Sequence, residues 1–209
     1  GAPIAGSSGD PLGQIYVVFG AASGFGTLDA SGRAVIDLSD GGANFAPGKG
    51  FVIRGAALNE QAGVQASQAG DFNGDGYDDL AIGAPYENYA GIASAGMVFV
   101  VFGSADGLDF SRRQVWTQNS AGIADTAEED DRFGAVLAIG DLDRQSLFGT
   151  SRADLVIAAP NEEDGATFDA GTVHVLYSDA AGPSATGSLQ LFRPGGSVQG
   201  GEVGKTLLS

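Results

Sequence analysis

An internal repeat constrains the fold of this chain more than any other feature of its sequence. A Gly-Ala-Pro triplet or a close variant ends at Pro3, Pro85 and Pro160, so that successive copies are 82 and 75 residues apart. A Phe-Gly pair or a degenerate equivalent marks the repeat a second time, with copies 71 and 70 residues apart. These pairs are Ala62-Gly63, Phe133-Gly134 and Val203-Gly204. Because two independent landmarks agree on one period, we interpret the chain as a repeat protein.

Each repeat contains four short segments with the character of β-strands. They are rich in β-branched and aromatic residues and bounded by glycine, and no helical period of useful length is present. The segments are residues 51–54, 63–69, 79–84 and 97–102 in one repeat and residues 114–118, 134–139, 154–159 and 172–177 in the next, with a similar run at 14–20. Four-stranded repeats are typical of β-propeller blades. We therefore predict an all-β fold, a β-propeller of four-stranded antiparallel blades.

The predicted repeats amount to about three blades, whereas a propeller usually has roughly four to eight. Open sheet edges are an aggregation hazard, so we expect the edges to be covered by further blades, by copies of the same chain or by other proteins. We interpret residues 1–209 as one partial propeller with four sections. These are the second half of a blade plus a linker (1–50), two repeats (51–112 and 113–180) and the start of the next repeat (181–209).

A loop between two predicted strands has the spacing of a calcium site. Oxygen-bearing side chains occupy loop positions one, three, five and nine as Asp71, Asn73, Asp75 and Asp79, and Tyr77 would contribute its backbone carbonyl. Ca²⁺ takes about six to eight oxygen ligands at about 2.3–2.6 Å, which such a loop can supply if Asp79 binds through both oxygens. Glycine at position six permits the sharp turn that this wrapping needs. The spacing predicts a bound Ca²⁺.

Two other interpretations of this loop compete with calcium binding. An EF-hand needs a glutamate at position twelve, and that position is Ile82, inside an apolar run. A solvated turn rich in Asp, Asn and Gly is the second alternative, and the alternation of the oxygen-bearing side chains argues against it. Calcium binding remains the favoured prediction.

The loop and the apolar run that follows it carry a family resemblance. Residues 79–85 and 154–160, together with Phe133-Gly134, resemble the two halves of FG-GAP repeats, which are known from the β-propeller of integrin α subunits and from bacterial surface and secreted proteins. The resemblance covers essentially the whole chain. It implies a seven-bladed propeller, an extracellular or cell-surface location, and a role in adhesion or protein–protein assembly. Other FG-GAP propellers accompany a phospholipase-like hydrolase domain, and this alternative places catalysis outside the present residues.

A second loop repeats the calcium pattern in a damaged form. Asp141, Asp143 and Asp154 are its candidate ligands, but the aspartate and glycine expected at positions five and six are missing. Arg144 or Arg152 could instead place a guanidinium where the ion would lie, paired with the carboxylates. Both a cation site and an arginine-filled site are open.

The remaining polar features favour simpler interpretations. The acidic runs 125–131 and 162–164 could form an extra cation or partner site, but solvated loops are the favoured interpretation. His174 is the only histidine and lies within a predicted strand, so we expect it and Trp116 to be structural and predict no catalytic residues.

Composition excludes two classes of partner. The formal charge of −16 is opposite to the basic surface of a general nucleic-acid-binding protein. No apolar run approaches the roughly 20 residues of a membrane span, so we expect no membrane insertion. With 43% hydrophobic residues there is enough apolar material for a packed core.

Overall fold

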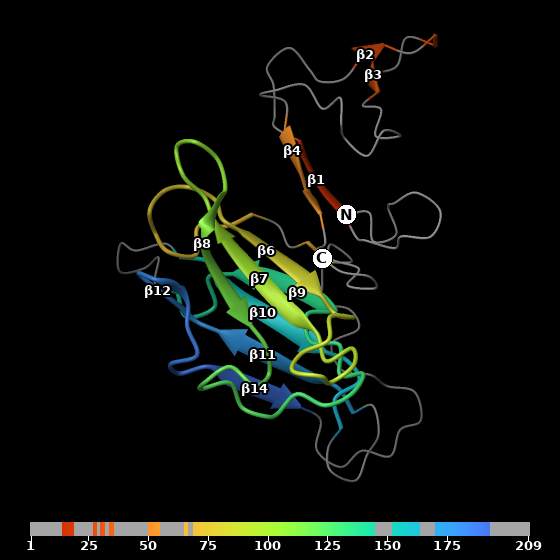
Figure 1. Cartoon of the computed structure of the whole chain (residues 1–209). Helices are drawn as coiled ribbons and strands as arrows, with labels where there is room; N and C mark the ends of the chain where they lie inside the picture. Colours follow the sequence, from red (N-terminus) through yellow and green to blue (C-terminus); the bar gives the residue numbers. More distant parts are fainter. Residues whose placement is uncertain are drawn as a thin grey trace.

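The computed structural model describes residues 14–18, 27–28, 30–31, 34–35, 50–54, 65–66, 69–144, 152–163 and 170–192. These residues form strands, turns and loops without any helix (Figure 1). The landmarks at Pro3, Ala62-Gly63 and Val203-Gly204 lie outside the described residues. The predicted all-β fold is confirmed.

Two four-stranded antiparallel sheets make up most of the described structure. The first sheet has the order β5-β6-β7-β8 and the second the order β14-β11-β10-β9. In the first sheet the strands are β5 (Gln65–Ala66), β6 (Leu80–Ala84), β7 (Met97–Phe102) and β8 (Asp109–Trp116). In the second they are β9 (Val136–Gly140), β10 (Asp154–Ala159), β11 (Thr172–Leu176) and β14 (Leu189–Phe192). In both sheets each strand pairs with the next strand of that sheet along the chain, which is the arrangement expected for propeller blades.

Shorter pairs flank these sheets. β1 (Gln14–Val18) pairs antiparallel with β4 (Gly50–Arg54), with Tyr16 opposite Val52. β2 (Thr27–Leu28) pairs with β3 (Ala34–Val35). β12 (Ser178–Asp179) and β13 (Gly182–Pro183) form a small hairpin between β11 and β14.

The pairing of the strands corrects the grouping expected from the repeat. The repeat predicts that residues 114–118 open the second unit, but residues 109–116 form β8, the outer strand of the first sheet, where Val115 lies opposite Phe99. In the same way β4 pairs with β1 instead of joining β5, β6 and β7. The physical reason is the short turn after β7, closed by a 3.1 Å hydrogen bond from Gly107 N–H to the Ser104 carbonyl. Such a turn returns the chain beside the strand it has just left.

The two sheets pack face to face, and the alternation of side chains along each strand divides the core into layers. Leu155 and Ile157 of β10 face the first sheet, where they pack with Val98 and Val100 of β7. Val156 of the same strand belongs to a separate cluster on the opposite face. Burial of every β10 residue explains the near-continuous apolar sequence of this strand. Figure 1 shows the sheets in this stacked arrangement.

The Phe-Gly landmark lies at the contact between the sheets. Phe133 is fully buried and joins the core between the two sheets. Gly134 has a φ of +88° and donates its N–H to the Ala158 carbonyl at 3.0 Å. A Cβ at this position would lie 2.7 Å from Cγ2 of Val98 and 2.9 Å from the Met97 carbonyl oxygen. Glycine is therefore required both by its backbone conformation and by the lack of space.

Candidate metal centre

The first loop, residues 71–79, is closed at its base by a pair of backbone hydrogen bonds. Gly70 N–H donates to the Asp79 carbonyl at 3.2 Å, and Asp79 N–H donates to the Gly70 carbonyl at 2.9 Å. The loop therefore stands at the start of β6, whose remaining residues are mostly buried in the first sheet. A rigid strand fixes where the loop begins and ends.

The polar side chains of the first loop turn inward and organise its backbone. Asp71 Oδ1 accepts from Gly74 N–H at 2.6 Å and from Asp75 N–H at 3.1 Å, and Asp71 Oδ2 accepts from Gly76 N–H at 2.8 Å. Asn73 Oδ1 accepts from Asp75 N–H at 2.9 Å, and Asp75 Oδ1 accepts from Tyr77 N–H at 3.0 Å. Three of the predicted ligands thus share one compact turn. An oxygen that accepts a single hydrogen bond keeps a second lone pair for a cation.

Glycine at position six has the conformation that the sequence predicted. Gly76 has a φ of +90°, and a Cβ added there would have no atom outside its own chain neighbourhood within 4 Å. The requirement for glycine here is therefore one of backbone conformation, because a side chain would find open space.

Asp79 has a role that the spacing did not reveal. Its side chain is fully buried, Oδ2 accepts from Phe72 N–H at 2.8 Å, and Oδ1 accepts from Gly103 N–H at 2.7 Å. Burial raises the pKa of Asp79, while these two backbone hydrogen bonds act in the opposite direction. The spacing assigns both oxygens to the ion, but in the structure Oδ2 holds the start of the loop at Phe72 and Oδ1 joins the loop to Gly103, the residue that follows β7.

The second loop repeats this arrangement, in which a buried aspartate accepts hydrogen bonds from both its own loop and the end of a neighbouring strand. We call such an aspartate an anchor. Asp154 is fully buried, its Oδ2 accepts from Leu142 N–H at 2.7 Å, and its Oδ1 accepts from Ser178 N–H at 2.9 Å. Burial raises the pKa of Asp154 as it does that of Asp79. The anchor is therefore a property of both sheets, with one aspartate at the start of the second strand holding the loop before it and the end of the third strand.

The second loop also brings its three predicted ligands together. Oxygen atoms of Asp141, Asp143 and Asp154 all lie within 4.8 Å of one another. Among the described residues, the carboxylates of the first loop form no triplet of this kind. The loop with the damaged sequence thus gathers carboxylates more closely than the loop with the intact sequence, in which Asp71 turns toward the N–H groups of residues 74–76.

Contacts between the sheets join the two loops. Ala153 N–H donates to the Asp71 carbonyl at 2.8 Å, and Arg152 Nε donates to the Asn73 carbonyl at 3.2 Å. The Arg152 side chain also lies against Gly74, where a Cβ would come within 3.0 Å of Nε. Arg152, which the sequence placed as a possible substitute for the ion of the second loop, therefore contacts the first loop.

The sequence interpretation missed two buried acids. Asp131 is 1% exposed and Glu162 is 4% exposed, so the interpretation of both acidic runs as solvated loops was wrong for these residues. Their positions carried a signal, because Asp131 precedes Phe133-Gly134 by two residues and Glu162 follows Pro160 by two. Acids that directly flank buried motifs are candidates for burial themselves.

His174 is buried, as a structural histidine should be, but its hydrogen bonding was not foreseen. Its ring packs edge-on against Phe133, with ring centroids 5.5 Å apart. Nε2 has no hydrogen-bond partner among the described residues. Burial lowers the pKa of His174 to about 4, so the ring is neutral at physiological pH.

Comparison with known proteins agrees with this geometry. Residues 63–101 match the family model for the FG-GAP repeat. Residues 63–101 are an FG-GAP repeat. The FG-GAP repeat contains β5, the whole first loop, β6 and most of β7, so the candidate metal centre and the strand it precedes lie within one family unit.

Several relatives resemble the chain over part of its length. A phosphatidylinositol-glycan-specific phospholipase D of Mus musculus is 31% identical over 112 residues, which are 54% of this chain and 12% of that protein. Integrin alpha-PS3 of Drosophila melanogaster is 33% identical over 102 residues, 48% of this chain and 8% of that protein. Integrin alpha-6 of Homo sapiens is 42% identical over 53 residues, 25% of this chain and 4% of that protein. The chain thus spans a small fraction of each of these relatives.

The described part of the chain contains no apolar helix of the length needed to cross a membrane.

Proposed function

We propose that this chain is a calcium-binding part of an extracellular β-propeller that serves in adhesion or protein–protein assembly. The observation that carries the proposal is the first loop, whose inward-turned Asp71, Asn73 and Asp75 lie inside the FG-GAP repeat. Oxygen ligands on one short loop are the donor set that Ca²⁺ prefers. Similarity to integrin α chains favours the adhesion or assembly class.

In this proposal the ion binds side-chain oxygens of Asp71, Asn73 and Asp75 and the backbone carbonyl of Tyr77. Asp79 then contributes chiefly by holding the loop closed, through the hydrogen bonds that it accepts from Phe72 and Gly103. The ion neutralises carboxylates that would otherwise repel one another. Because it binds the folded loop, it stabilises the folded state by mass action.

The second loop is proposed as a further Ca²⁺ site with fewer ligands. Asp141, Asp143 and Asp154 lie close enough to share one ion. The loop lacks the aspartate and glycine of positions five and six, so we expect weaker binding than in the first loop. Extracellular calcium-binding modules have dissociation constants of about 10⁻⁴–10⁻³ M. A site with fewer ligands can therefore still serve outside the cell.

Assembly through strand edges or loops is the proposed mode of partner binding. β8 and β14 are outer strands of the two described sheets. Leu189 and Leu191 of β14 are 44% and 49% exposed, which supports contact of this strand with further blades or another copy of the chain. The proposal that the repeats belong to a seven-bladed propeller rests on the resemblance to integrins.

A second candidate is a non-catalytic propeller attached to a secreted hydrolase domain. The matches to phosphatidylinositol-glycan-specific phospholipase D favour it. Both candidates place catalysis outside these residues, as is usual for an FG-GAP repeat module. The sequence and intact mass of the natural polypeptide discriminate between them, since an attached hydrolase domain adds both mass and a catalytic sequence.

The calcium site is tested with Asp75→Ala against Asp78→Ala as a matched control. Asp78 is exposed, lies in the same loop and carries the same charge, but it occupies an even position outside the predicted ligand set. We expect Ca²⁺ to raise the melting temperature of the wild-type chain and of the Asp78 variant. The Asp75 variant should lose most of the rise and melt like the wild type in chelator.

Thermal melts in chelator and in Ca²⁺, together with sedimentation velocity on the same samples, measure both parts of the proposal. An equal calcium-induced shift in both variants would contradict the assignment of the loop. A wild-type chain that sediments as a single monomer at every concentration would contradict assembly through strand edges.

A further inference from the structure

Asn73 and Gly74 of the first loop form the only Asn-Gly pair of the chain. In such a pair the backbone nitrogen of glycine can attack the side-chain amide carbon of asparagine, because glycine has no side chain to obstruct the approach. The attack closes a succinimide ring and releases ammonia, and water then opens the ring to aspartate or isoaspartate. How fast this happens in a folded chain depends on how the reacting atoms are held.

The nitrogen that would make the attack directs its hydrogen at a carboxylate. Gly74 N–H donates to Oδ1 of Asp71 at 2.6 Å. A general base has to lie within about 2.6–3.2 Å of the atom whose proton it takes, and Asp71 meets this requirement. Gly74 and the next residue, Asp75, are exposed, so water can reach the ring that the attack would form.

The side-chain amide of Asn73 is held at both of its polar atoms. Oδ1 accepts from Asp75 N–H at 2.9 Å, and Nδ2 donates to Oδ2 of Asp75 at 2.9 Å. The opposite orientation of the amide would lose both hydrogen bonds, so this one is fixed. An N–H donor at about 2.7–3.1 Å from an amide oxygen stabilises the negative charge that the oxygen gains during attack. The Asp75 carboxylate stabilises the positive charge that Nδ2 gains when it is protonated to leave.

We propose that the first loop promotes the deamidation of its own Asn73, with Asp71 as the general base and Asp75 N–H as the donor to the oxyanion. The bond from Gly74 N to Cγ of Asn73 forms while Asp71 takes the Gly74 proton. The bond from Cγ to Nδ2 then breaks, and Nδ2 takes protons from solvent and leaves as ammonia. Water opens the succinimide and Asp71 returns its proton to solvent, so one water is consumed for each ammonia released.

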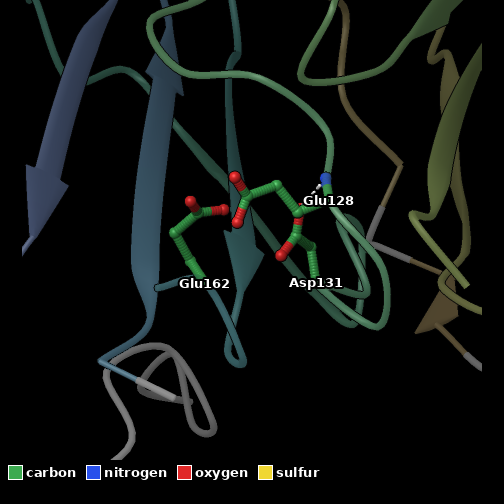
Figure 2. Close-up of side chains that lie close together, drawn as sticks. All are labelled: Glu128, Asp131 and Glu162. Atoms are coloured by element: carbon green, nitrogen blue, oxygen red, sulfur yellow. Dashed lines mark hydrogen bonds between the residues drawn. The ribbon is translucent and has the colours of Figure 1, made fainter. Parts of the chain in front are cut away.

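A carboxylate that accepts from a backbone N–H is not sufficient for this reaction. Glu128 N–H also donates to a carboxylate, that of Asp131, as the dashed line in Figure 2 shows. The residue before Glu128 is Ala127, which has no amide for the nitrogen to attack. The base and the amide occur together at Asn73.

Asn119 provides an internal reference for the opposite case. Its Oδ1 accepts from Ala127 N–H at 3.1 Å, which resembles the contact at Oδ1 of Asn73. The nitrogen that would attack it, that of Ser120, donates instead to the Thr117 carbonyl at 3.0 Å. A carbonyl oxygen is no base, and serine carries a side chain that glycine lacks. We therefore expect Asn119 to be stable where Asn73 is converted.

The conversion would change the loop that we propose as a calcium site, and this consequence rests on that proposal. Aspartate at position 73 keeps the spacing of the loop and adds a carboxylate at loop position three, so we expect it to bind Ca²⁺ more tightly. Isoaspartate takes its side-chain carbon into the main chain and alters the spacing, so we expect it to bind Ca²⁺ more weakly.

Peptide mapping by mass spectrometry measures the conversion in the full chain, incubated in chelator at neutral pH. We expect Asn73 to be converted faster in the folded chain than in the same chain unfolded in urea. Asp71→Asn keeps an acceptor for Gly74 N–H but removes the base, and should slow the conversion by about tenfold or more. Asp78→Asn is the matched control, because Asp78 is an exposed residue of the same loop outside these contacts. It should be converted at the wild-type rate.

The proposal is overturned if the folded wild type converts Asn73 no faster than the unfolded chain, a comparison that needs no variant. It is also overturned if Asp71→Asn, shown to be folded by circular dichroism, converts Asn73 at the wild-type rate. Calcium titration of the separated products tests the consequence for the loop. Products that bind Ca²⁺ like the unmodified chain would contradict the calcium assignment, whereas the rates measured in chelator do not depend on that assignment.

Discussion

The hydrogen bonds of Asp79 predict that its substitution destabilises the chain even without calcium. Asp79 is fully buried and accepts from the N–H groups of Phe72 and Gly103. Replacement by alanine removes both acceptors and leaves two backbone donors without partners. Replacement by asparagine keeps one acceptor and turns an NH₂ group toward the other donor.

The expected magnitude follows from the number of hydrogen bonds lost. A hydrogen bond to a charged group contributes about 1.5–3 kcal/mol, and an unsatisfied buried donor costs about 1–3 kcal/mol. Asp79→Ala should therefore lower the free energy of unfolding by about 3–5 kcal/mol, and Asp79→Asn by about half of that. Asp154→Asn, which disturbs the equivalent anchor of the second sheet, should resemble Asp79→Asn.

Urea unfolding in chelator, followed by tryptophan fluorescence and circular dichroism, measures these changes. The exposed neighbour Asp78, replaced by asparagine, is the control and should stay near the wild type. If Asp79→Asn unfolds like the wild type in chelator and loses only the stabilisation by calcium, Asp79 is a metal ligand and the reasoning from its two hydrogen bonds is refuted.

Two further predictions concern residues between the sheets. Gly134→Ala should lower the free energy of unfolding by at least about 2 kcal/mol, because a Cβ would lie 2.7 Å from Val98 at a φ of +88°; a melting temperature equal to that of the wild type would contradict the required close approach. His174, with its pKa lowered to about 4, should make the chain lose stability as the pH falls from the unfolded value of about 6.5 toward 4, since the unfolded state then binds the extra proton. Relative to His174→Leu, the loss should reach about 3 kcal/mol, as measured by urea unfolding of both chains at several pH values. The raised pKa values of Asp131 and Glu162 act with the opposite sign but equally in both chains, so an identical acid profile for the two chains would exclude a contribution of His174.

The strands could be predicted well from the sequence, and their grouping could not. Residues 97–102 are a β-branched and aromatic run between two glycines, and residues 154–159 are a near-continuous apolar run that ends before a proline. The strands predicted at both places have the bounds that the structure has. Which strands share a sheet depends on the turns between them. The segment at 109–113 is polar and exposed, so its pattern gave no indication that β8 begins there and pairs with β7.

Only those features of the candidate site that depend on neighbouring residues could be predicted from the sequence. The spacing of residues 71–76 identified a turn organised by Asp71 and Gly76, because the hydrogen bonds that the Asp71 side chain accepts come from the N–H groups of residues 74–76. The partner of Asp79, the N–H of Gly103, is 24 residues away and belongs to another part of the sheet. Burial of Asp131 and Glu162 likewise depends on how residues 117–135, between the two sheets, pack against the second sheet. The local sequence gives only an indirect indication of this packing.

The repeated anchor explains how the second loop can depart from the sequence pattern of the first loop while the sheet keeps its form. Asp154 ties Leu142 to Ser178 just as Asp79 ties Phe72 to Gly103, and neither pair of hydrogen bonds involves an ion. In the first loop, closure of the sheet and the proposed binding of a cation therefore depend on different residues, since Asp79 closes the loop and Asp71, Asn73 and Asp75 are the proposed side-chain ligands. If the proposed ion binds, substitutions at positions five and six should change its affinity, whereas a substitution of the anchoring aspartate should destabilise the sheet itself. A repeat can in this way exchange its cation chemistry for other contacts, such as the one that Arg152 makes with the neighbouring loop, without losing its place in the stack.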